Sequence, residues 1–152
     1  IKTSCLAKAA VVAADEKESG ERALLNLGHT FAHAFEAEMG YGDDLLHGEA
    51  VAMGMIMAFD LSVRMGLCPA ADAQRVRAHL AAAGLRIAPP TRGPHGVITA
   101  ARLIAHMAGD KKTQDGVTTF VLARRIGDAF LSRDVRAEDL TAVLTDALSA
   151  TR

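Results

Sequence analysis

The feature that most constrains the fold is a long apolar segment near the middle of the chain. The ten residues from Ala50 to Phe59 read AVAMGMIMAF and include no charged or polar side chain. A helix that is apolar on every side must be buried, so other elements must pack around it. We therefore predict a buried helix over 45–65, in which Met53, Met55 and Met57 fill the core.

The composition indicates one helical domain over residues 1–152. Half of the 152 residues are apolar, which is enough for a real core. The chain is rich in Ala, Leu and Met and poor in aromatic residues, as expected for helices packed on helices. It opens at Ile1 directly into helix-like sequence, which is typical of a fragment of a longer chain.

Charge and cysteine usage exclude several classes of partner. The formal net charge is −1 and the basic residues are scattered, so we expect neither nucleic acid nor a membrane as partner. The sequence has no signal peptide and no apolar run long enough to cross a bilayer. Cys5 and Cys68 follow no pattern and indicate a reducing compartment. We predict a cytoplasmic protein.

Periodicity and turn residues predict the remaining elements. A hairpin should join two alternating segments through the Ile126–Gly127 turn. The predicted fold is mainly α with this one small β-hairpin. The expected helices cover 3–15, 22–39, 45–65, 70–83, 99–108 and 138–149, and the expected strands cover 118–123 and 129–132.

Three histidines indicate a candidate metal site. His29 and His33 are four residues apart and would share one helix face, and His47 stands just before the apolar helix. Neutral imidazole is a common zinc ligand, and a catalytic zinc keeps about three protein ligands with one open position. By spacing alone such a pair is more often accidental, so the neighbouring residues matter.

The neighbours favour a site. Gly28 and Gly48 flank the histidines and leave room for close backbone approach. Glu36 and Glu49 are candidate acceptors for a ring N–H.

A polar stripe on the predicted helix over 22–39 points to a ligand. Arg22, Asn26, His29 and His33 are separated by four, three and four residues, so they would point the same way. Burying such a stripe is costly without partners, and Arg suits phosphate or carboxylate recognition.

At this point the sequence resembles a known family. The motif residues are RALLNLGHTFAHAFE (22–36), GYG (40–42) and LHGEAVAMG (46–54), with KAAVVAADEKE (8–18) upstream and Asp110-Lys111-Lys112 before the hairpin. They closely resemble the 3-dehydroquinate synthase family, and the wider sugar-phosphate cyclases share much of the pattern.

The resemblance implies an activity and roles for individual residues. It implies NAD- and Zn²⁺- or Co²⁺-dependent conversion of 3-deoxy-arabino-heptulosonate 7-phosphate into 3-dehydroquinate with loss of phosphate, in the shikimate pathway. The implied metal ligands are His29 and His47, the catalytic groups are His33 and Glu18, and the substrate-binding residues are Lys8, Arg22, Asn26 and one of Lys111 and Lys112, of which we favour Lys112. On residue type alone, Lys8, Glu18 and the two loop lysines would be solvated surface groups.

The resemblance also implies partners. The chain has no Gly-rich strand–turn–helix for a dinucleotide, so it should hold no NAD-binding residue. An N-terminal α/β domain absent from this chain would bind NAD and supply the third zinc ligand, a glutamate. We therefore expect the chain alone to be inactive, and the complete enzyme to be a homodimer acting on a small phosphosugar.

Three alternatives remain open at this stage. The first is a sister cyclase that forms a valiolone- or inosose-type ring. The second is a non-catalytic helical zinc or interaction module, although a structural zinc site prefers four closed ligands. The third is a related iron- or zinc-dependent alcohol dehydrogenase, against which the polar stripe argues.

Overall fold

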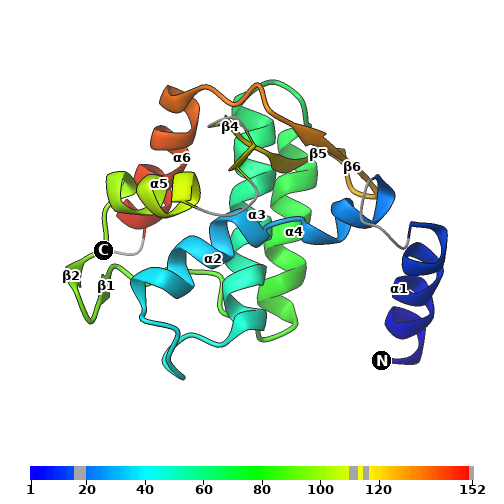
Figure 1. Ribbon diagram of the computed structural model, residues 1–152, viewed down its shortest axis with the longest axis horizontal. Helices are drawn as coiled ribbons and strands as arrows, with labels where there is room; N and C mark the ends of the chain where they lie inside the picture. Colours follow the sequence, from blue (N-terminus) through cyan, green and yellow to red (C-terminus); the bar gives the residue numbers. More distant parts are fainter. Residues whose placement is uncertain (16–19, 110–112, 115–116, 151–152) are drawn as a thin grey trace.

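The computed structural model describes residues 1–15, 20–109, 113–114 and 117–150 (Figure 1). Helices dominate these ranges, with three short antiparallel strand pairs, which confirms the mainly α fold. The elements are α1 (Lys2–Ala14), the 3-10 helix η1 (Glu21–Asn26), α2 (His29–Glu38), α3 (His47–Arg64), α4 (Ala70–Ala82), β1 (Arg92–Gly93), β2 (Gly96–Val97), α5 (Ala100–Gly109), β3 (Thr113–Gln114), β4 (Val117–Thr118), β5 (Phe120–Arg125), β6 (Asp128–Ser132) and α6 (Ala137–Ser149).

Helix α3 is the centre of the packing, as its apolar sequence predicts. It contacts α2, α4, α6 and β5, and Figure 1 shows it surrounded by these elements. Met53 and Met57 are buried in it, while Met55 is half-buried. The prediction of a buried helix is confirmed, with Met55 as the one methionine of the three at the edge of the core.

The main core joins α2 and α3 to the second half of the chain. Phe31 and Phe35 of α2 are fully buried against residues of α5, β5 and α6. Each large side chain removed from water in this way contributes about 2–3 kcal/mol. The buried face of α2 therefore holds this helix against α3 and the second half of the chain.

The predicted hairpin is present as β5 and β6, which pair antiparallel around a turn with Gly127 at φ +86°. A buried serine on α3 attaches it to the helices. The Ser62 hydroxyl donates to the carbonyl of Ala58 at 2.7 Å and accepts from the Ala123 N–H at 3.1 Å. One side chain thus satisfies a strand donor that would otherwise be buried without a partner.

The prediction of one continuous helix over 22–39 is wrong. The segment is η1 followed by a break, and α2 begins only at His29. Gly28 lies in the left-handed region with φ +84°, which stops helical hydrogen bonding. The break allows the backbone of Gly28 to pass against Gly54 of α3.

The loop after α2 and two further strand pairs are details that the sequence does not predict. Tyr41 in that loop is 76% exposed. It has φ +54° and donates its N–H to the carbonyl of Glu36 at 2.9 Å, which ends the helix. The strand pairs β1–β2 and β3–β4 were not predicted, because strands of two residues leave no periodic pattern.

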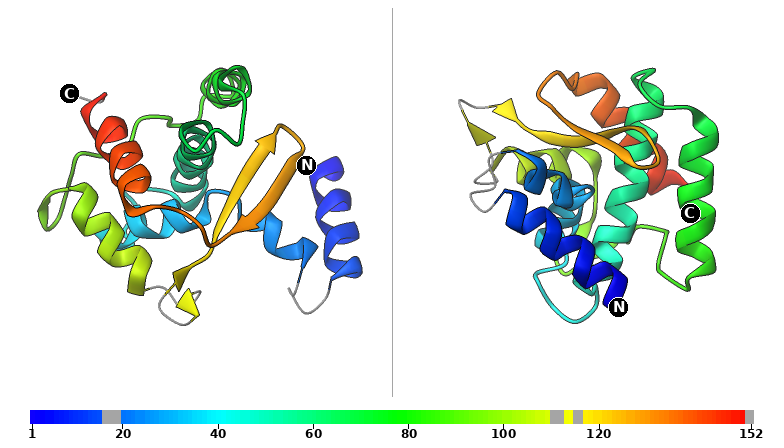
Figure 2. Two further views of the ribbon diagram at one scale, coloured as in Figure 1. Left: turned by 90° about the horizontal axis from the view of Figure 1, so that it is seen from above. Right: turned by 90° about the vertical axis from the view of Figure 1, so that its right-hand side faces the viewer.

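Helix α1 lies at the edge of the molecule. Figures 1 and 2 show it next to η1 and the β5–β6 hairpin, at the opposite end from α5 and α6. None of its residues is buried, and Leu6 is 61% exposed. In the described ranges no helix is both long and apolar enough to cross a membrane.

Candidate functional site

The three predicted histidines come together at the junction of α2 and α3. His29 is the first residue of α2, His33 follows one turn later, and His47 is the first residue of α3. The ring centroid of His29 lies 5.8 Å from that of His33 and 5.4 Å from that of His47. The His33 and His47 centroids are 6.4 Å apart. The starts of the two helices therefore bring the three imidazoles into one cluster.

The close approach of Gly28 and Gly54 sets this geometry. A Cβ built on Gly28 would lie 2.7 Å from the carbonyl carbon of Gly54, and one on Gly54 would lie 2.9 Å from the carbonyl carbon of Gly28. Neither contact is possible for a real side chain, and backbone atoms cannot move aside cheaply. Since Gly28 immediately precedes His29, the glycine pair sets how deeply the first histidine sits against α3.

The histidines differ in exposure and partners. Nδ1 of His29 is fully buried, whereas the His47 side chain is 60% exposed. Nδ1 of His47 lies 2.8 Å from Oε1 of Glu36. Glu49 accepts the Leu46 N–H at 3.3 Å and caps α3 instead. Of the two acceptors predicted from sequence, Glu36 is therefore the one that contacts a histidine ring, that of His47.

The histidine nitrogens suit a zinc or cobalt ion, but they are too few to form a complete metal site. Imidazole nitrogens are borderline ligands that Zn²⁺ and Co²⁺ accept readily. Within the described ranges, however, no three His, Cys, Asp or Glu side chains are grouped as ligands of a single ion. His29 and His47 could hold a metal only with at least one further donor.

The other predicted site residues lie in three different settings. Arg22 and Asn26 are half-buried on η1, just before the histidine helix and not on it. The Asp15 carboxylate accepts the N–H groups of Gly20 at 2.8 Å and Arg22 at 3.0 Å, so it fixes where η1 begins. Sequence reasoning did not assign Asp15 a role. Lys8 is exposed on α1.

Three predicted residues lie outside the part of the chain that the structure describes. They are Glu18, Lys111 and Lys112. Their roles remain predictions.

A groove of about 530 Å³ opens beside His33, between α2 and α5. Its walls include Thr30, Ala34 and His106. The Nε2 of His106 lies 2.9 Å from Oε1 of Glu38, a carboxylate that is 1% exposed.

Arg102 is the second partner of the buried Glu38 carboxylate. Its Nε donates to Oε1 of Glu38 at 3.0 Å, and its Nη2 lies 2.8 Å from Oε2. Its Nη1 donates to the carbonyl of His95 at 2.9 Å. The sequence gives no sign that Glu38 is buried, because a glutamate near a helix end is usually exposed. The cluster fastens α5 and the β1–β2 hairpin to α2.

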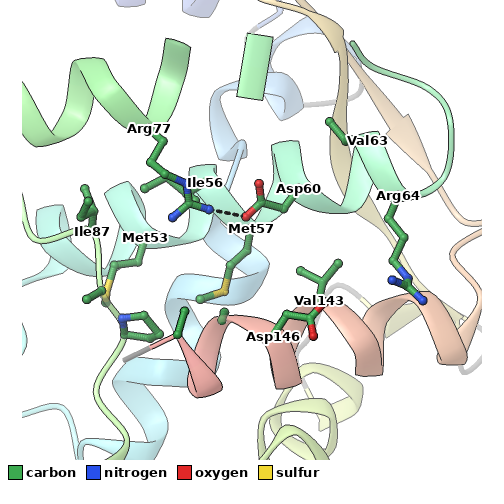
Figure 3. A pocket seen from close by; sticks show the side chains of 14 residues that line it. Met53, Ile56, Met57, Asp60, Val63, Arg64, Arg77, Ile87, Val143 and Asp146 are labelled. Atoms are coloured by element: carbon green, nitrogen blue, oxygen red, sulfur yellow. Dashed lines mark hydrogen bonds and ion pairs between the residues drawn. The ribbon is translucent and has the colours of Figure 1, made fainter. Parts of the chain in front are cut away.

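A second groove, of about 540 Å³, lies on the other side of α3 and contains none of the predicted site residues (Figure 3). Its walls are largely apolar, with Met53 and Met57 on α3 and Val143 on α6. Arg77 donates to Asp60 across it at 2.6 Å. Burial raises the pKa of Asp60 above its usual value although Arg77 opposes the shift. Because this second groove contains none of the predicted site residues, we take the histidine cluster as the candidate functional site.

Comparison with known proteins gives a consistent set of similarities. The family model described as 3-dehydroquinate synthase C-terminal matches residues 1–113. A 3-dehydroquinate synthase of Rhodospirillum rubrum is 57% identical over 147 residues, which are 97% of this chain. The chain spans only 38% of the length of that relative.

Solved structures of sugar-phosphate cyclases share the fold. A 2-epi-5-epi-valiolone synthase from Streptomyces hygroscopicus, with NAD⁺ and Zn²⁺ bound, matches 84% of this chain and 33% of its own, with 31% identity and a TM-score of 0.67. A 2-deoxy-scyllo-inosose synthase complexed with carbaglucose-6-phosphate, NAD⁺ and Co²⁺ matches 93% of this chain and 39% of its own, with a TM-score of 0.73. At 24% identity, the second similarity concerns the fold alone.

Proposed function

Because the chain belongs to the 3-dehydroquinate synthase family, we propose that it forms the helical, metal- and substrate-binding part of a 3-dehydroquinate synthase. The complete enzyme would convert 3-deoxy-arabino-heptulosonate 7-phosphate into 3-dehydroquinate and release phosphate. The observation that carries this proposal is the cluster of His29, His33 and His47, which the motif supplies and the fold gathers in one place.

His29 and His47 would hold the divalent ion, with a further ligand from outside this chain. A bound ion of this kind polarises substrate hydroxyl groups and lowers their pKa, which favours hydride loss to NAD. The two side chains suit such an ion because imidazole nitrogens are good zinc ligands. Their rings come from different helices and have centroids 5.4 Å apart.

His33 would act as the acid/base group. A neutral imidazole nitrogen can take a proton from a substrate hydroxyl and return it in a later step. It sits one helical turn beyond His29 and lines the groove between α2 and α5, which gives a substrate room beside it.

The cationic and amide side chains would recognise the two anionic ends of the substrate. Arg22 has the planar fork that pairs with phosphate or carboxylate, and Asn26 can bind a hydroxyl. Lys8 and one of Lys111 and Lys112 would add positive charge, and Glu18 would accept a proton. We propose that the NAD-binding site and the third metal ligand belong to a preceding α/β domain, and that the complete enzyme is a dimer.

A sister cyclase activity is the second candidate, because the valiolone synthase noted above is 31% identical over 84% of the chain. The relatives that match at above 50% identity are named 3-dehydroquinate synthase, which favours the first candidate.

The test measures phosphate release by the complete gene product with NAD and Zn²⁺. The expected substrate is 3-deoxy-arabino-heptulosonate 7-phosphate, with no turnover of the phosphosugars used by valiolone- and inosose-type cyclases. His33→Ala should lower kcat by roughly 100-fold or more, since a positioned acid/base group contributes that much. His79→Ala, an exposed histidine on α4, is the matched control. Full activity of His33→Ala would contradict the assigned role, and no turnover of any cyclase substrate would favour a non-catalytic module.

A further inference from the structure

Glu36 holds one of the two proposed metal ligands through its side chain. It lies on α2, three residues after His33, and its side chain is 13% exposed. Its Oε1 lies 2.8 Å from Nδ1 of His47, whose side chain is 60% exposed. A sheltered carboxylate therefore holds a histidine that is otherwise largely open to solvent.

We propose that Glu36 is a positioning residue of the metal site, which selects the tautomer and the orientation of His47. This inference rests on the function proposed above. Neutral imidazole carries a single N–H, so when Nδ1 donates to the carboxylate, the lone pair is on Nε2. A carboxylate behind a metal-binding histidine also makes the ring a better electron donor.

The position of His47 explains why such a partner is needed. It is the first residue of α3, where no preceding helical turn restricts its ring, and it follows an exposed loop. The nearest acid on its own helix, Glu49, is occupied by the cap on Leu46. Without Glu36 the ring would lose rotational order and its fixed tautomer.

The location of Glu36 makes it suitable for this role. Its own carbonyl accepts the Tyr41 N–H at 2.9 Å in the motif that closes α2. Its backbone is therefore fixed by the helix and by the helix end. Helix α2 supplies one proposed ligand directly, as His29, and orients the other through Glu36. The two ligands would then be arranged before any ion arrives, which reduces the ordering cost of binding.

The experiment measures the Zn²⁺ dissociation constant of the complete gene product by competition with a chromophoric chelator. Glu36→Ala removes the acceptor and should weaken binding by about 10–100-fold, the range measured for such outer partners. Glu36→Gln keeps an oxygen that accepts from Nδ1 but removes the charge, so its affinity should lie between those of Glu36→Ala and the unaltered protein. Asp43→Asn removes an exposed carboxylate from the loop before α3 and should leave the affinity unchanged.

Two further measurements separate the possible failures. Thermal unfolding of the metal-free proteins should give the same Tm for the Glu36 variants as for the unaltered protein, with a smaller rise on adding Zn²⁺. His29→Ala tests the metal site itself, and unchanged Zn²⁺ affinity in that variant would overturn the proposed function. If His29→Ala weakens binding but Glu36→Ala binds as tightly as the unaltered protein, the metal site stands and the role of Glu36 is wrong.

Discussion

Gly28 and Gly54 cross with their backbones in contact, although all of α2, the loop that follows it and the first seven residues of α3 lie between them in the sequence. A Cβ on Gly54 would also lie 3.2 Å from the backbone nitrogen of Ala32. Both Gly28 and the first turn of α2 therefore leave no space for a side chain at position 54. The crossing lets α3 approach α2 at the end where His29 stands. Any side chain there would push the two histidine-bearing helices apart.

We therefore expect Gly54→Ala to destabilise the protein. Overpacking a tight contact costs about 1–3 kcal/mol, and here the obstacle is backbone, so the cost should be at the upper end. Urea unfolding would show a lower midpoint.

The matched control for this variant is Gly48→Ala, which makes the same change in the first turn of the same helix. A Cβ there meets nothing within 4 Å, so the close backbone approach predicted at Gly48 is absent. Alanine favours helix by about 0.5–1 kcal/mol over glycine. Equal stability of the two variants would show that the crossing is not tight.

The crossing also explains where sequence reasoning succeeded and where it failed. The apolar run that forms α3 predicted its own burial, because a helix without a polar face has only one stable environment. The break at Gly28 could not be read in the same way, since it depends on contact with Gly54, a residue of another helix. Periodicity reports on one helix at a time and favoured one continuous helix.

The buried carboxylate of Glu38 and its two partly exposed partners support a second prediction. Arg102→Met should lower the free energy of unfolding by about 1–3 kcal/mol, because it removes the guanidinium that pairs with the buried Glu38 carboxylate and leaves only His106 beside it. The double variant Glu38→Leu with Arg102→Met should recover part of this loss, since no charge remains buried. Urea unfolding of the single and double variants measures both. A double variant less stable than Arg102→Met would mean that the cost comes from lost packing and not from an unpaired charge.

Asp139 predicts a dependence of stability on pH. The hydrogen bond from Arg136, at 2.7 Å, holds the pKa of Asp139 below its usual value, and Arg64 adds to the effect. The folded state therefore prefers the carboxylate. Its contribution to stability is fully present above the ordinary aspartate pKa of about 4, and is lost as pH falls through the lower pKa of the folded state. Asp139→Asn should be less stable than the unaltered protein at pH 7, and the difference should shrink at pH 3.

Urea unfolding at the two pH values tests this sign. Asp134→Asn, which removes an exposed carboxylate shortly before α6, is the control and should show no such change. A difference between Asp139→Asn and the unaltered protein that persists at pH 3 would show that packing, and not charge, is responsible.

The candidate site could be predicted only as far as local motifs reach. His29, His33 and His47 lie within 19 consecutive residues, so one helix–loop–helix is enough to gather them, and the sequence contained that signal. The contacts of Glu38 could not be predicted in this way. Its partners Arg102 and His106 are more than 60 residues away in the sequence, and no local motif around Glu38 indicates them. The sequence gives no reason to prefer Glu36 or Glu49 as the partner of a histidine ring. The structure distinguishes them, because Glu49 accepts the Leu46 N–H and caps α3.

The last prediction concerns what this chain can do by itself. With only His29 and His47 as proposed ligands, the isolated 152-residue chain should bind Zn²⁺ weakly, because a catalytic zinc site in a complete enzyme has about three protein ligands. It should release no phosphate from the heptulosonate phosphate even with NAD and Zn²⁺ added, since the proposed dinucleotide site belongs to another domain. Calorimetric titration with Zn²⁺ and a phosphate assay test the two halves of this prediction. Nanomolar affinity that disappears in His29→Ala would mean that the chain completes its own metal site, and measurable turnover would mean that it needs no second domain.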